Sequence, residues 1–145
     1  MQPIQSPSFA VSQPFPKDAM HRSRQLLAAV AAGLPPGLSE LAQQVRAQHA
    51  RFDAEFGELA RLLAVDLDML VLANVSYDLF LSLGCSTVAV ATDRGPVVAR
   101  NMDWWPEDLL ARASCRLAYG DPDAPTHWQA GWIGAVGAVT GMSAR

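Results

Sequence analysis

The chain has 145 residues, of which 50% are apolar and 17% charged, and its formal net charge is −3. These proportions predict one ordinary globular domain with a real core, and they exclude a disordered chain. The basic residues are spread along the sequence without a Lys/Arg run, so neither a nucleic acid nor an anionic membrane surface is an expected partner.

The two cysteines, Cys85 and Cys115, are too few for a disulfide framework, and no Cys/His cluster has the spacing of metal ligands. We therefore expect a reducing, cytoplasmic location, and neither a metal nor a cofactor.

The amino-terminal residues 1–17 are rich in Gln, Ser and Pro, without the apolar run of a secretory signal, and are expected to form a loose arm. The most apolar stretch, residues 62–83, contains several Asp and Asn residues, which are costly in a bilayer. It predicts a buried helix and no stable membrane insertion.

Helical patterns cover the first half of the chain, over residues 18–32, 38–63 and 66–82. The Gly- and Pro-containing segment 33–37 separates the first two, and Asp66 is placed to cap the third. The middle helix carries one apolar stripe with a single polar interruption, formed by Leu41, Val45, Gln48, Phe52, Phe56, Leu59 and Leu63.

The second half is mostly β. Residues 86–92 and 96–100 are rich in Val and Ala around Asp93-Arg94-Gly95, a pattern typical of a hairpin. A short helix over 105–112 follows, and then strands are expected over 114–119, 126–132 and 135–140.

If the hairpin turns about Arg94, Cys85 lies opposite Asp103 or within one residue of it. Arg100 and Asp103 are then close to Cys85, where a guanidinium favours a thiolate over a thiol and a carboxylate favours a nearby ammonium. The plain alternatives are that Cys85 is a small core residue and that Arg100 and Asp103 form a surface ion pair.

The segments Gly84-Cys85-Ser86-Thr87, Asp93-Arg94-Gly95 and Ala99-Arg100-Asn101-Met102-Asp103 together resemble the start of the catalytic subunit in acid ceramidase-like N-terminal-nucleophile amidases. This family includes acid ceramidase, N-acylethanolamine acid amidase, bile-salt and penicillin V hydrolases and isopenicillin N acyltransferase. The resemblance covers roughly residues 70–142, and Asn74-Val75-Ser76-Tyr77-Asp78-Leu79 is similar to the helix before the cleavage point.

The resemblance implies a precursor in which Cys85 attacks the carbonyl of Gly84, so that cleavage frees Cys85 as a new amino terminus. A free α-amino group titrates near ~8 and can act as the base for its own side chain, without a histidine. Gly84 suits the cleavage point because it has no Cβ and leaves its carbonyl open to attack.

By the same resemblance, Asp103 orients the Cys85 amino group, Arg100 supports the thiolate, and Trp105 lines an acyl pocket. The implied function is a self-cleaving cysteine amidase that hydrolyses an N-acyl amide with an apolar acyl part through an acyl-enzyme. The alternatives are an acyltransferase of the same family, or an inactive fragment that acts as a helical interaction module.

The resemblance also implies the fold class, an α+β protein. A helical pro-segment over residues 1–84 precedes the start of an αββα N-terminal-nucleophile hydrolase core over residues 85–145, and the two segments stay associated after cleavage. The spacing from Cys85 to Arg100 is slightly shorter than in the family, which a tighter hairpin turn accommodates. Family members continue past the last residues of this chain, and the Asn that completes their oxyanion hole lies there. We therefore expect a truncated chain in which no residue has that role.

Overall fold

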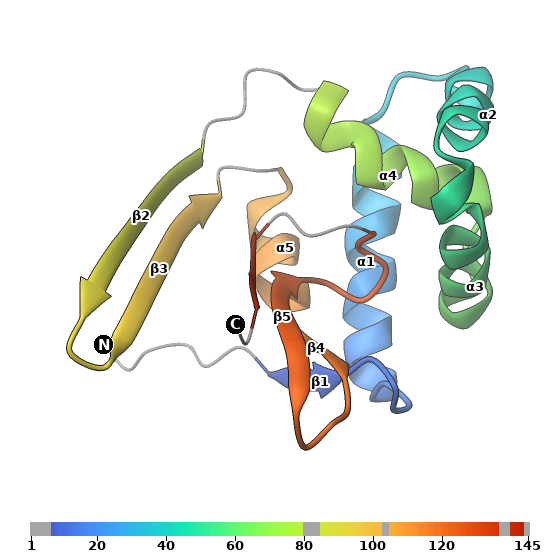
Figure 1. The fold of residues 1–145 in the computed structure, drawn as a ribbon. Coiled ribbons are helices and arrows are strands. Elements are labelled where there is room, and N and C mark those ends of the chain that lie inside the picture. Colours follow the sequence, from blue (N-terminus) through green and yellow to red (C-terminus); the bar gives the residue numbers. More distant parts are fainter. Residues whose placement is uncertain (1–6, 80–84, 103–104, 137–139, 144–145) are drawn as a thin grey trace.

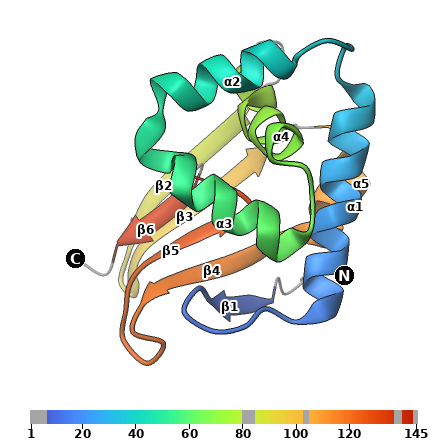
Figure 2. The same ribbon diagram turned by 90° about the vertical axis from the view of Figure 1, so that its right-hand side faces the viewer.

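The structure is a computed structural model, which describes residues 7–79, 85–102, 105–136 and 140–143. It is a mixed α+β fold with a four-stranded sheet and a separate two-stranded hairpin. Helices α1 to α4 lie on one side of the four-stranded sheet and the hairpin lies on the other (Figures 1 and 2). The helices and strands, in chain order, are β1 (Ser8–Ala10), α1 (Lys17–Gly33), α2 (Ser39–Gln48), the short 3-10 helix η1 (Ala50–Phe52), α3 (Asp53–Leu63), α4 (Leu67–Leu79), β2 (Cys85–Thr92), β3 (Gly95–Met102), α5 (Glu107–Ala113), β4 (Cys115–Gly120), β5 (Pro125–Gly131) and β6 (Thr140–Ser143).

Helix α1 confirms the first predicted helix. Its buried side chains recur every three or four residues, which gives the helix a single inward face. They are Ala19, Ser23, Leu26, Leu27 and Val30. The exposed side of its amino-terminal half is polar, and there Arg22 donates a hydrogen bond of 2.9 Å to Asp18, one turn earlier.

The prediction of one continuous helix over 38–63 is wrong, because the chain breaks at His49 and continues through η1 into α3. The break falls at the polar interruption of the stripe, and it lets α2 and α3 each pack against α4. Arg46 bridges the break with a 2.6 Å hydrogen bond to Asp53, and its guanidinium also lies 3.6 Å from Asp68. The hydrogen bond from Arg46 lowers the pKa of the Asp53 carboxyl.

Helix α4 is the centre of the helical layer and confirms the third predicted helix over its described length. The backbone N–H of Met69 donates a 2.9 Å hydrogen bond to the side chain of Asp66, so Asp66 caps the helix as expected. Leu70, Val71 and Ala73 are at most 1% exposed. No helix in the described part of the chain is long and apolar enough to cross a membrane.

The four-stranded sheet has the order β1-β4-β5-β6, with β1 parallel to β4 and the other pairs antiparallel. The expectation of a loose arm over 1–17 is wrong for β1, because Ser8–Ala10 pairs with residues 116–118. The backbone N–H of Arg116 also donates a 2.8 Å hydrogen bond to Pro7, and Val11 donates one of 2.9 Å to Ala118. Residues 7–11 are thus hydrogen-bonded to strand β4 of the carboxy-terminal half.

Strands β4 and β5 confirm two of the predicted strands. The strand expected over 135–140 is wrong at residues 135 and 136, because residues 132–136 form a turn and a loop. Residues 137–139 of that prediction lie outside the described residues, and β6 covers Thr140–Ser143. This loop is drawn into the core, since Trp132, Ile133 and Ala135 are all buried. The apolar residues at 132–136 therefore reflect loop burial rather than a strand.

Candidate functional site

The β2–β3 hairpin has the turn that the sequence predicts. Asp93 and Arg94 form the two-residue connection, and the next residue, Gly95, has a φ of +107°, which favours glycine. The Thr92 hydroxyl donates a 2.7 Å hydrogen bond to the Gly95 carbonyl and accepts one of 3.2 Å from the Arg94 backbone N–H. Local chemistry alone is enough to fix this turn.

The turn sets the register at the other end of the hairpin, where the candidate nucleophile lies. Cys85 pairs with Met102, and Thr87 pairs with Arg100. The expected position of Cys85, within one residue of the position opposite Asp103, is therefore confirmed for the backbone. Cys85 and Arg100 occupy diagonal positions of one antiparallel ladder, a spacing of about 7–8 Å within reach of a long side chain.

The expected site residues are described to different extents. Gly84 and Asp103 lie outside the described residues, and Cys85 is described by its backbone only. Arg100 is half-buried at the end of β3. The structure thus brings the backbone positions of Cys85 and Arg100 to the same end of the hairpin. The expected contact among thiol, guanidinium and carboxylate involves Asp103 and the Cys85 side chain, which lie outside the described part of the chain.

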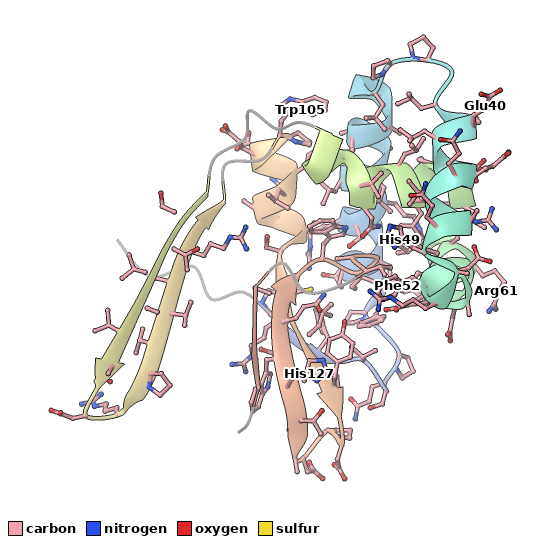
Figure 3. All side chains as sticks on the ribbon, turned by 45° about the horizontal axis from the view of Figure 1, so that its top comes forward. Glu40, His49, Phe52, Arg61, Trp105 and His127 are labelled. Carbon is pink, nitrogen blue, oxygen red and sulfur yellow. The ribbon has the colours of Figure 1, made fainter. Side chains whose placement is uncertain are left out.

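Trp105 connects this end of the hairpin to the helical layer. Its ring lies directly against Gly33 at the carboxy end of α1, where an added Cβ would be 2.5 Å from Cη2 of Trp105. Trp105 as a whole is 52% exposed, and it lies at the top of the view in Figure 3. An aromatic ring with one supported side and one open side is suited to contact an apolar group.

Cys115 has surroundings that disfavour nucleophilic chemistry. It lies at the start of β4 and is 3% exposed, and its thiol is free. Burial raises the pKa of Cys115 to about 11, so the thiol carries almost no thiolate at neutral pH. The burial of Cys115 indicates a structural role for this residue.

Asn74 is a residue whose role sequence reasoning missed. Its side-chain amide donates 2.9 Å hydrogen bonds to the carbonyls of Leu70 and Gly134, and its carbonyl oxygen accepts a 2.7 Å bond from the Val136 backbone N–H. This residue therefore fastens α4, the helix before the expected cleavage point, to the loop between β5 and β6. The available signal was an amide that follows the apolar run 69–73 of the helix.

The described residues contain no group of three or more His, Cys, Asp or Glu side chains placed to hold a metal ion. No protein-family model matches the sequence, and no curated protein matches it either.

Proposed function

We propose that this chain carries the nucleophile of a self-cleaving cysteine amidase, with Cys85 as the nucleophile and the Gly84–Cys85 bond as the cleavage point. The observation that carries the proposal is the hairpin register. A motif that resembles an N-terminal-nucleophile amidase begins at the first residue of a strand, and Arg100 occupies the diagonal position beside it. A guanidinium at this position would favour the thiolate form of Cys85.

The proposed cleavage proceeds in two steps. Sγ of Cys85 attacks the carbonyl carbon of Gly84, the bond from that carbon to the Cys85 nitrogen breaks, and the nitrogen takes up a proton to become an α-amine. Water then hydrolyses the thioester, which leaves a carboxylate on Gly84 and a free thiol on the new amino-terminal Cys85. In this scheme Arg100 stabilises the thiolate, and Asp103 orients the α-amine.

The freed Cys85 would then attack an N-acyl amide substrate and form an acyl-enzyme that water or an amine resolves. Trp105 is proposed to contact the apolar acyl part. Its exposure and the packing of its ring against Gly33 support this role. A hydrolase and an acyltransferase differ only in which acceptor takes the acyl group.

The pro-segment and the catalytic segment are proposed to remain together after cleavage. Contacts across the proposed boundary support this association. β1 pairs with β4, Asn74 bonds to Gly134 and Val136, and Trp105 packs on Gly33.

An acyl-enzyme trapping experiment tests this function. The protein is incubated with a chromogenic N-acyl anilide that has an apolar acyl chain, and peptide mass spectrometry locates the acyl group. We expect a burst of aniline and an acyl adduct on Cys85, both reduced to background in Cys85→Ala. Arg100→Ala is expected to slow the burst about 100-fold, because the thiolate loses its counter-charge.

Cys115→Ala is the matched control, because it removes the other thiol and leaves the hairpin unchanged. It is expected to keep the full burst, since the Cys115 thiol is buried and protonated. An adduct on Cys115, or an equal burst from Cys85→Ala, would rule out the assigned nucleophile.

A further inference from the structure

The β2–β3 hairpin exposes apolar side chains on both of its faces. The register places Val88, Val90 and Val97 on one face and Val98 on the other. They are 59%, 50%, 52% and 46% exposed, in that order. Figure 1 shows the hairpin standing apart from the helices and the four-stranded sheet.

A hairpin of this kind lacks what normally stabilises it. Two strands alone are marginally stable in water, and further strands or a packed face are needed for a stable sheet. Strands β2 and β3 contact mainly each other. Pairing with a further strand would therefore stabilise the hairpin.

The two outer edges of the hairpin differ in how readily they can pair with another strand. β3 contains Pro96, which has no backbone N–H, and Arg100, and both residue types discourage strand addition. Residues 86–92 of β2 contain neither a charged residue nor a proline. Because hydrogen-bonded and non-hydrogen-bonded pairs alternate, every second residue of β2 directs its N–H and C=O away from β3. The open edge is thus that of β2.

We propose that a second copy of this chain occupies the β2 edge, with the two β2 strands antiparallel and Ala89 of each copy opposite Ala89 of the other. This pairing joins two hairpins into one four-stranded sheet with a two-fold axis at Ala89. The β2 sequence is self-complementary in this register, since Val88 of one copy lies opposite Val90 of the other.

The charge pattern favours an identical strand as the occupant. With no charged side chain in residues 86–92, two copies bring no like charges together across the new ladder. Residues that lie opposite each other in an antiparallel pair project on the same face of the sheet. Val88 and Val90 of both copies therefore lie on one face and form a continuous apolar surface. The proposal does not depend on the amidase function, because it uses only the strand edge.

Sedimentation velocity over a wide range of protein concentration tests the proposal, with the wild-type protein and the Cys85→Ala chain measured in parallel. Both are expected to reach twice the chain mass of 15.6 kDa. Ala89→Lys places two ammonium groups opposite each other at the two-fold axis, and is expected to weaken the dimer about tenfold or more at low salt. An equimolar mixture of Ala89→Lys and Ala89→Glu is expected to restore it.

Val98→Lys is the matched control, because Val98 is the register partner of Ala89, is exposed on the same face, and lies on β3. It is expected to leave the dimer intact. A wild-type chain that stays monomeric at the highest concentration overturns the proposal. Equal dissociation by Ala89→Lys and Val98→Lys also overturns it, since that result would assign the contact to a sheet face.

Discussion

Replacing Gly134 with alanine is expected to destabilise the protein by about 2–4 kcal/mol, because two separate penalties act at this position. Gly134 has a φ of +108°, which an L side chain rarely adopts, and an added Cβ would lie 2.7 Å from Cδ1 of Leu63. Leu63 is fully buried, so it has little room to move. Urea denaturation followed by circular dichroism measures the loss.

Gly37→Ala separates the two penalties. Gly37 also has a positive φ, of +84°, but an added Cβ there meets nothing within 4 Å. It is expected to cost only about 1 kcal/mol. The double variant Leu63→Ala/Gly134→Ala is expected to lose less than the sum of the single losses, since the smaller side chain removes the clash. Equal losses for Gly37→Ala and Gly134→Ala would contradict the packing of this loop against α3.

Replacing Asn74 with alanine is expected to destabilise the protein by about 2–4 kcal/mol, because the Gly134 carbonyl and the Val136 N–H both lose their partner. The Leu70 carbonyl also loses a hydrogen bond, although it lies within the helix ladder. Urea denaturation gives the free energy. Hydrogen exchange gives a local measure, in which the Val136 amide is expected to exchange faster than in the wild type.

Ser76→Ala is the control for Asn74→Ala. Ser76 lies on the same helix and is fully buried, and its hydroxyl donates a 2.7 Å hydrogen bond to the Ala73 carbonyl of the preceding turn. Its loss is expected to cost less than about 1 kcal/mol. If Asn74→Ala lowered the free energy of unfolding no more than Ser76→Ala does, the hydrogen bonds from Asn74 to the loop would not stabilise the protein.

The parts of the fold that the sequence predicts are those decided by neighbouring residues. Asp66 caps α4 through a bond to Met69, three residues later, and the Thr92 side chain shapes a turn that ends at Gly95. The register of Cys85 then follows by counting from that turn. Short-range turn and capping chemistry is readable from sequence because the partners are adjacent.

The parts that could not be predicted depend on residues far apart in the chain. β1 exists because it pairs with β4, and the Arg116 side chain bonds to Ser8 across 108 residues. The break at His49 follows from the packing of α2 and α3 on α4, which the apolar stripe alone does not reveal. The packing of the Trp105 ring against Gly33 likewise joins two distant segments, and no local sequence pattern indicates that they meet. Tertiary context overrides local propensity at each of these points.

The candidate site follows the same division. The end of the hairpin that holds Cys85 and Arg100 could be located, because a tight turn fixes an antiparallel register. The role of Asn74 could not, because its partners at Gly134 and Val136 are brought to it by the fold. A Cys in a Val/Ala strand is by itself a weak signal for a nucleophile. The Arg and Asp that follow it in the sequence are what favour a catalytic interpretation.

The intact mass of the purified chain under denaturing conditions, followed during incubation, tests whether Cys85 cleaves the bond to Gly84. We expect the 15.6 kDa species to be replaced by two fragments whose masses sum to the chain plus one water, with Cys85 as the new amino terminus. Cys85→Ala should keep the intact mass, and Cys115→Ala should cleave like the wild type. A wild-type chain that stays intact, or a Cys85→Ala chain that cleaves at the same bond, would contradict the assignment of Cys85 as a self-cleaving nucleophile.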